Sequence, residues 1–135
     1  MSLIKWTPEF SVNHPEIDKE HQSLFEMLNR FYQGIQESSP KEKLAQLIKG
    51  LINYARTHFK HEEEYMRSIA YPGLLAHQKE HQEFMDKVNE FYEKYTNGRL
   101  ILSIEVTNFI KNWITNHIKK EDKRYATFVG KEKNA

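Results

Sequence analysis

Four segments of the chain carry apolar side chains at alternating steps of four and three residues. This period places the side chains in one narrow stripe along an α-helix, as in helices that pack nearly parallel to one another. Gly and Pro are scarce and cluster between the segments, at Pro8–Pro15, Ser38–Pro40, Tyr71–Gly73 and Asn97–Gly98. The pattern predicts an all-α fold, an antiparallel up-down-up-down four-helix bundle. An extended N-terminal segment would precede it, and a short C-terminal helix over Lys123–Val129 would follow it.

Local signals predict where individual helices begin and end. Ser39 followed by Glu42 has the spacing of a capping box, with Pro40 at the first helical position of the second segment. Asn97-Gly98 has the composition of a C-cap for the third segment. Lys131–Ala135 is expected to be a loose tail.

Polar residues interrupt each apolar stripe at positions where Leu or Ile would be expected. In chain order they are His21, His58, Glu62, His77, His81 and His117. They lie near the start of the first and third segments and near the end of the second and fourth. Because neighbouring helices of an up-down bundle run in opposite directions, these four places lie at the same end of the molecule. The sequence therefore predicts one buried polar layer at that end.

A buried layer of imidazoles and carboxylates is costly unless every group is paired. Helical residues four apart share a face, so His58 with Glu62, and His77 with His81, can each reach one ion. The chain has no Cys, which excludes thiolate ligands, and its imidazole and carboxylate groups suit iron, zinc or manganese. We therefore expect a metal site, with a hydrogen-bonded polar layer as the simpler alternative.

Asp122 is a second candidate carboxylate, five residues after His117. Five residues turn a straight helix by about 140°, so the fourth helix must end or distort between them if both bind metal. Five histidines and two carboxylates are too many for one ion. Two six-coordinate ions offer more positions than these groups and a bridging oxygen can fill. The count predicts an asymmetric pair of ions, with three imidazoles on one, two on the other, and one position open for a small ligand.

The other polar residues near the stripes are expected to be bystanders. His61 lies on the flank of the second stripe and is predicted to be at the surface or to touch a ligand from outside. His14 is expected to be an ordinary exposed residue before the first helix. Five acidic residues fall off the stripes and are expected to be solvated: Asp18, Glu20, Glu63, Glu64 and Glu80.

The motifs that carry these residues resemble the hemerythrin family over nearly the whole chain. They are Ile17–His21, His58–Glu63, Tyr71-Pro72 with His77–His81, and Trp113 with His117–Asp122. The N-terminal segment with Trp6 is similar to that of single-domain bacterial hemerythrins. This resemblance implies that residues 1–135 form one hemerythrin-like domain.

The resemblance also implies a non-heme di-iron centre, with two iron ions (Fe2+/Fe3+) and a bridging oxo or hydroxo group. The implied ligands are His21, His58, Glu62, His77, His81, His117 and Asp122. One iron would take the last three histidines, the other would take His21 and His58 and bind dioxygen at its open position, and the carboxylates would bridge. The implied oxygen pocket consists of Leu24, Phe59, Trp113, Ile114, Ile118 and Tyr125. The implied function is reversible dioxygen binding for storage, transport or delivery, without catalysis.

Other functions compete with this one. His77-Gln78-Lys79-Glu80-His81 matches the H-x-x-E-H pattern of inverted zinc peptidases, but Glu80 falls off the stripe and the other candidate ligands go unexplained. A ferritin-like di-iron oxidase or iron store would need Glu-x-x-His pairs, which the sequence lacks. Sensing or scavenging of oxygen or nitric oxide, and supply of oxygen or iron to a partner protein, stay open on the same fold.

Charge and hydropathy narrow the set of partners. The 20 Lys and Arg residues against 19 Asp and Glu give a net charge of +1, without the basic excess of a nucleic-acid binder. No apolar run reaches the roughly 20 residues of a membrane span or has the form of a signal peptide. A cytoplasmic protein is therefore expected. The absence of a continuous apolar outer stripe favours a monomer.

Overall fold

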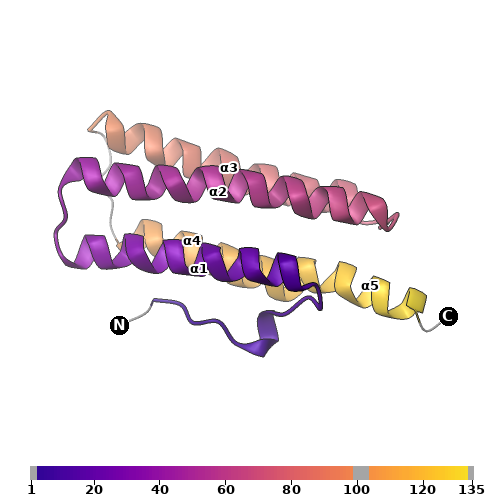
Figure 1. The fold of residues 1–135 in the computed structure, drawn as a ribbon. Coiled ribbons are helices and arrows are strands. Elements are labelled where there is room, and N and C mark those ends of the chain that lie inside the picture. Colours follow the sequence, from indigo (N-terminus) through magenta and orange to yellow (C-terminus); the bar gives the residue numbers. More distant parts are fainter. Residues whose placement is uncertain (1–2, 99–103, 134–135) are drawn as a thin grey trace.

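The computed structural model describes residues 3–98 and 104–133, and these are helical apart from the N-terminal segment and short connections. The elements are η1 (Pro8–Phe10), α1 (Pro15–Gln36), α2 (Lys41–Ser68), α3 (Leu74–Thr96), α4 (Ile104–His117), η2 (Ile118–Asp122) and α5 (Lys123–Lys133). Figure 1 shows α1 to α4 side by side and alternating in direction, with η2 and α5 continuing α4 at the end where α1 begins. The predicted all-α four-helix bundle is confirmed.

Helix boundaries differ from the sequence predictions in three places. α2 begins at Lys41 after an N-cap Pro40 without a side-chain capping bond, so the predicted capping box is wrong. His14 is half-buried and forms the N-cap of α1, where its imidazole accepts a hydrogen bond from the Ile17 N–H at 3.2 Å, so the expectation that it is an ordinary exposed residue is wrong. α5 continues past Val129 to Lys133, because the stretch has no Pro and Gly130 is accommodated within the helix; residues 134–135 of the predicted tail lie outside the described residues.

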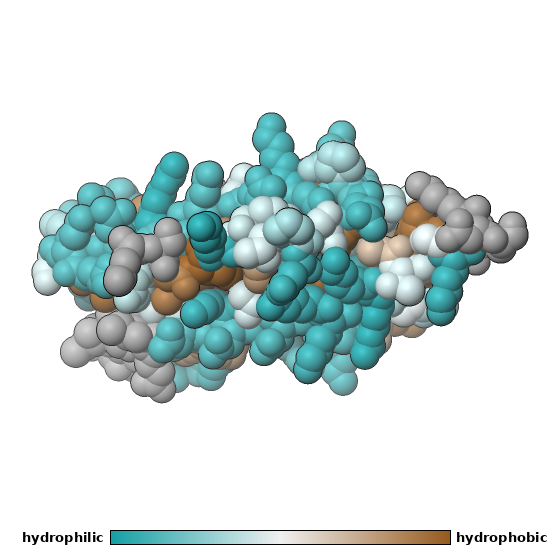
Figure 2. All heavy atoms as spheres, turned by 90° about the horizontal axis from the view of Figure 1, so that it is seen from below, coloured by the Kyte–Doolittle hydropathy of each residue, from teal (hydrophilic) through white to brown (hydrophobic). Residues whose placement is uncertain are grey.

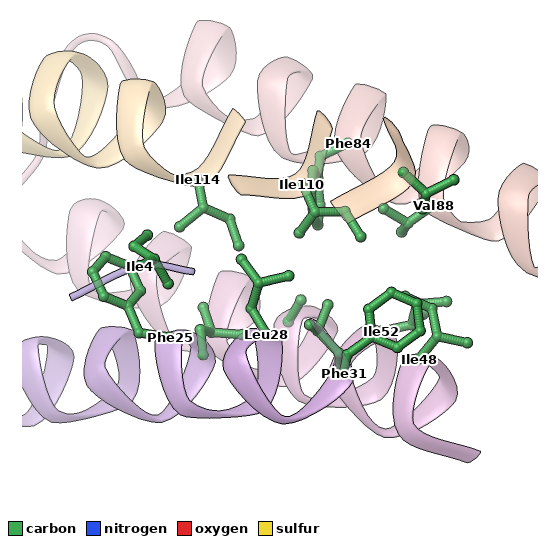
Figure 3. Close-up of a cluster of buried hydrophobic side chains, with 14 of the residues drawn as sticks. Ile4, Phe25, Leu28, Phe31, Ile48, Ile52, Phe84, Val88, Ile110 and Ile114 are labelled. Atoms are coloured by element: carbon green, nitrogen blue, oxygen red, sulfur yellow. The ribbon is translucent and has the colours of Figure 1, made fainter. Parts of the chain in front are cut away.

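The apolar core fills the bundle away from its polar end. Figure 3 shows side chains from all four helices pointing toward one another. Its fully buried members include Leu28, Phe31, Ile48, Ile52, Val88 and Ile110. Burial of side chains of this size stabilises a fold by about 1.5–3 kcal/mol each. This core therefore stabilises the bundle independently of the polar layer, and a smaller buried cluster of Val12, Ile17, Met66 and Tyr125 lies apart from it.

The N-terminal segment lies alongside the bundle (Figure 1) and is held by polar contacts at two points. The Asn29 side chain accepts from the Ile4 N–H at 3.0 Å and donates to the Ile4 carbonyl at 2.9 Å. The Asp18 carboxylate accepts from the Ser11 hydroxyl at 2.6 Å and from the Val12 N–H at 2.8 Å. Asp18 is therefore a fastening point for this segment, and the expectation that it is solvated is wrong.

The molecular surface is mostly polar. The face in Figure 2 is largely hydrophilic, and hydrophobic residues appear on it only in small, separate areas. Leu75 is a large apolar side chain left 80% exposed. Within residues 3–98 and 104–133, no helix has both the length and the apolar content needed to cross a membrane. The monomeric state stays a prediction.

Candidate metal centre

All seven residues predicted from the sequence as ligands lie together at one end of the bundle. α1 contributes one residue, α2 and α3 two each, and α4 and η2 one each. Each residue is between 0% and 4% exposed, and in chain order they are His21, His58, Glu62, His77, His81, His117 and Asp122. Antiparallel helices therefore bring the polar positions of the four stripes into one buried layer, as their order along the chain requires.

A distorted turn places Asp122 beside His117. α4 ends at His117, and η2 winds as a π-helix over Ile118–Asp122. A π-turn joins residues five apart, so it brings onto one face two residues that an α-helix would separate by about 140°. Asp122 Oδ1 lies 3.0 Å from His117 Nε2 as a result. The expected end or distortion of the fourth helix is present between these two residues.

Three imidazoles from α3 and α4 converge on one point and form the three-His group: His77, His81 and His117. His117 Nε2 lies 2.9 Å from His77 Nε2 and 3.1 Å from His81 Nε2. Ligand atoms held at right angles by bonds of about 2.1 Å lie about 3.0 Å apart. The three nitrogens therefore have the spacing of neighbouring ligands on one ion.

Two imidazoles from α1 and α2 form the smaller, two-His group: His21 and His58. Their ring centroids are 4.6 Å apart. Their Nε2 atoms lie 3.2 Å and 3.5 Å from Glu62 Oε2, respectively. The histidines therefore divide into three and two, the division that the count of coordination positions predicts.

The carboxylates of Glu62 and Asp122 lie between the two histidine groups, and each directs one oxygen toward each group. Glu62 Oε1 is 3.0 Å from His81 Nε2, whereas its Oε2 faces the two-His group. Asp122 Oδ1 is 2.8 Å from His77 Nε2, and its Oδ2 is 3.2 Å from His21 Nε2. One oxygen of each carboxylate thus faces each group, which is the arrangement of bridging ligands between two ions.

Unpaired buried oxygens provide an independent test of this arrangement. Glu62 Oε1, Asp122 Oδ1 and Asp122 Oδ2 are buried and make no hydrogen bond to any described residue. The imidazole nitrogens near them lack the direction of a hydrogen bond. A buried carboxylate oxygen without a partner is costly, and a cation bound between carboxylate and imidazole removes that cost. The donor set therefore fits a pair of metal ions.

The charges of the layer balance internally. Burial lowers the pKa of His21 and of His77, but the negative charges of Asp122 and Glu62 close to them outweigh it and raise both pKa values to about 10. Burial would raise the pKa of the two carboxyl groups, yet the surrounding imidazoles hold the pKa of Glu62 and of Asp122 well below its usual range. Protons on the imidazoles can therefore neutralise the carboxylates when metal is absent.

Three acidic residues hold the imidazoles from outside the layer. His58 Nδ1 donates to Glu20 at 2.6 Å. His81 Nδ1 donates to Glu63 at 2.8 Å, and His117 Nδ1 donates to Glu80 at 3.2 Å. A carboxylate on the second nitrogen fixes the orientation of a metal-binding imidazole and raises its basicity. The expectation that Glu20, Glu63 and Glu80 are solvated is therefore wrong.

The positions of these acids contain a signal that the stripe analysis missed. Each is adjacent in sequence to a candidate ligand, and each reaches an imidazole on the next helix along the chain. A residue one position away from the buried stripe lies at the boundary with the neighbouring helix, so its side chain can reach a histidine of that helix. His61 also donates to Glu20, at 3.0 Å, and is 53% exposed, so it lies at the surface as predicted and contacts an outer carboxylate.

A small apolar cavity lies beside the two-His group. Its volume is about 10 Å³, and the polar residues at its floor are His21, His58, His117 and Asp122. Five of the six predicted pocket residues line it: Leu24, Phe59, Trp113, Ile114 and Ile118. Tyr125 is absent from this wall, and its hydroxyl donates to Glu62 Oε2 at 3.0 Å. Tyr125 therefore contacts a candidate bridging ligand.

Aromatic rings of the cavity wall also fix two imidazoles of the three-His group. Trp113 stacks on His117 with ring centroids 4.4 Å apart, and Phe59 stacks on His81 at 3.9 Å. Flat stacking restricts rotation of each imidazole about its own axis. The same two side chains therefore shape the cavity and orient candidate ligands.

The fold and the site together define a class of protein: a four-helix bundle with a buried histidine and carboxylate cluster able to hold two metal ions. A family model described as the hemerythrin HHE cation binding domain matches residues 13–129. This chain belongs to the hemerythrin family, as its motifs predict. The prediction that residues 1–135 form a single domain stays a prediction.

Several relatives match most of this chain. It is 35% identical to a bacteriohemerythrin of Clostridium acetobutylicum, over 91% of this chain and 98% of that protein. It is 31% identical to a bacteriohemerythrin of Methylococcus capsulatus, over 93% and 95% of the two chains. A myohemerythrin of Theromyzon tessulatum is 29% identical, over 90% and 89%. A crystal structure of wild-type hemerythrin superposes with a TM-score of 0.88 at 29% identity, covering 93% of this chain and 97% of the other.

Proposed function

We propose that this protein binds dioxygen reversibly at a non-heme di-iron centre, for oxygen storage, transport or delivery. The observation that carries the proposal is the uneven division of histidines around two shared carboxylates, with an apolar cavity on the poorer side. The iron with fewer protein ligands is then the one with an open position. The apolar cavity lies beside the two-His group, where that open position would be.

Each part of the site has a role in this proposal. The three-His group would hold one iron, the two-His group the other, and Glu62 and Asp122 would bridge them. Two iron ions with a bridging oxo or hydroxo group would supply the electrons that dioxygen takes up on binding. The five wall residues are apolar or aromatic, and the carboxylate that lines the cavity, Asp122, would be a metal ligand, so the wall itself offers no acid to drive oxygen on to further chemistry.

A zinc hydrolase finds less support in the same residues. A general base must lie within hydrogen-bond reach of the reacting water. Glu80 accepts a hydrogen bond from His117 Nδ1, the nitrogen that faces away from the centre. Glu80 is thereby occupied on the outer side of the imidazole. We therefore include the absence of catalysis in the proposal, together with a cytoplasmic location; sensing, scavenging and iron supply are alternative uses of the same centre.

Metal content and oxygen titration test the proposal directly. The purified protein should contain about two irons per chain, as two coordination groups require. Addition of dioxygen to the reduced protein should produce a visible peroxide-to-iron charge-transfer band that disappears when oxygen is removed. Immediate irreversible oxidation, or about one zinc per chain, would contradict it.

Substitution of Glu62 tests the bridging role. Glu62→Ala removes a carboxylate that faces both groups, so iron and oxygen binding should be lost while helix content by circular dichroism is retained. Glu64→Ala is the matched control, because Glu64 is an exposed residue of the same helix. If Glu62→Ala retains two irons and binds oxygen, the bridging assignment is wrong.

A further inference from the structure

A groove on the outside of η2 and α5 carries positive charge. Its volume is about 360 Å³, and it is lined by Lys120, Lys123, Arg124, Thr127, Phe128 and Lys131. We call this surface the basic groove. Every charged residue that lines it is a cation. The whole chain has a net charge of only +1, so this concentration is local and does not reflect a basic composition.

Three of these four cations have no counter-ion among the side chains that the structure describes. Arg124 pairs with Glu121 at 3.3 Å. No carboxylate among residues 3–98 and 106–131 lies within ion-pair distance of Lys120, Lys123 or Lys131. Like charges held close together repel one another and create a positive potential that attracts an anionic surface. The basic groove therefore contributes little to the stability of this chain and is suited to an acidic partner.

The lining residues follow one face of the helix. Lys120, Arg124, Thr127 and Lys131 are spaced by four, three and four residues, which keeps them on one side across about three turns. Phe128, a half-buried aromatic residue, lies within the stripe. Protein interfaces commonly combine an aromatic anchor with a polar rim that sets orientation. A hollow of this composition fits the surface of a second protein.

The basic groove lies at the metal end of the bundle. Lys123 directly follows Asp122, the candidate bridging ligand, and Lys120 belongs to the same π-helical turn. Figure 1 shows α5 extending past the first turn of α1. A partner held here would therefore lie next to η2, the segment whose Asp122 faces both groups of histidines.

We propose that the basic groove docks the acidic face of a protein electron carrier. This inference rests on the proposed function, because a di-iron centre that has been oxidised irreversibly needs external electrons to bind oxygen again. Each encounter would transfer one electron, oxidising one carrier and reducing one ferric ion, so two encounters restore the diferrous state. Electrostatic attraction would accelerate the encounter and orient the carrier toward the metal end.

Charge reversal with a matched control tests this docking site. The probe is a plant-type ferredoxin, an acidic one-electron carrier, added to the iron-loaded protein. Lys120→Glu with Lys131→Glu should weaken binding at low salt by at least about 10-fold. Lys5→Glu with Lys43→Glu, two exposed lysines away from the basic groove, changes the net charge equally and should change binding less than about two-fold. The reduction rate of the ferric protein by reduced ferredoxin should follow the same order.

Salt dependence and competing anions supply the remaining outcomes. Raising the salt concentration should weaken wild-type binding and abolish the difference between the two double variants. Equal losses in both double variants, or binding of RNA or anionic lipid vesicles without binding of ferredoxin, would overturn the proposal. Binding is measured separately from oxygen reversibility, so failure of docking and failure of the proposed oxygen function give different results.

Discussion

The Tyr125 hydroxyl donates a hydrogen bond to Glu62 Oε2 across 3.0 Å, and both side chains are completely buried. The bond joins α5 to α2 at the centre of the polar layer. Burial, together with the neighbouring carboxylates, raises the pKa of Tyr125 well above its usual value, so the hydroxyl remains a donor at neutral pH. The C-terminal helix therefore orients a candidate bridging ligand that belongs to another helix.

Removal of this hydroxyl should loosen the metal centre. Tyr125→Phe deletes a hydrogen bond to a charged group, which should lower the free energy of unfolding by about 1.5–3 kcal/mol. Loss of a group that orients a ligand should weaken iron binding by about 10–100-fold, measured by competition with a chelator. Tyr95→Phe is the control, because the Tyr95 hydroxyl bonds the Lys41 carbonyl in another part of the bundle. Equal iron affinities in the two variants would contradict this role of Tyr125.

Glu20, the outer carboxylate bound to His58, should be needed for tight iron binding, whereas the exposed His61 beside it should not. Glu20→Ala leaves the His58 imidazole without its outer partner and should weaken iron binding by about 10–100-fold. His61→Ala removes only an exposed contact to Glu20 and should have less than about two-fold effect. Iron should be lost first from the two-His side, seen as a fall from two irons toward one. If His61→Ala weakens iron binding as much as Glu20→Ala does, the role assigned to Glu20 is wrong.

The periodicity of the sequence is sufficient to predict the layer of histidines. His77 and His81 are one turn apart, so any α-helix places both on one face, and the alternation of helix direction brings His21 and His117 to the same end. The same arithmetic correctly requires a distortion before Asp122. These features depend only on backbone geometry, which the spacing of residues specifies.

The contacts around the layer depend on neighbouring helices, and a single stripe does not specify them. Glu63 is one position off the stripe of α2, and its partner His81 belongs to α3. The side on which Tyr125 packs depends on the π-helical turn before it, which rotates α5 relative to α4. The amphipathic pattern assigns such residues to solvent or core because it contains no information about the rotation of one helix against the next.

Metal binding should release protons. In the metal-free protein, the pKa of His21 and of His77 is raised to about 10, so both imidazoles are protonated at pH 8. A metal ion binds neutral imidazole, so loading at pH 8 should release about two protons from these residues. Apparent affinity should therefore rise about 100-fold per pH unit until pH approaches the raised pKa values, and level off above them. Anaerobic titration with Fe2+ in a weakly buffered indicator solution measures the release; its absence would show that metal-free imidazoles are neutral.

The apolar wall should protect the reduced centre, and two leucines one turn apart separate this effect from simple destabilisation. Leu24 lines the cavity beside the two-His group, whereas Leu28 lies in the apolar core away from it. Both are buried, so each change to Ala should cost about 2–5 kcal/mol in the free energy of unfolding.

The cavity of about 10 Å³ is close to the smallest space that holds one water, and Leu24→Ala would enlarge it. A water admitted by Leu24→Ala would bring a proton donor to the two-His group, and iron held by that group would then oxidise irreversibly more readily. Leu24→Ala should therefore oxidise several-fold faster in air than wild type, followed by visible absorption, while Leu28→Ala oxidises at the wild-type rate. If both variants oxidise equally fast, the faster oxidation results from lost stability and not from an enlarged cavity.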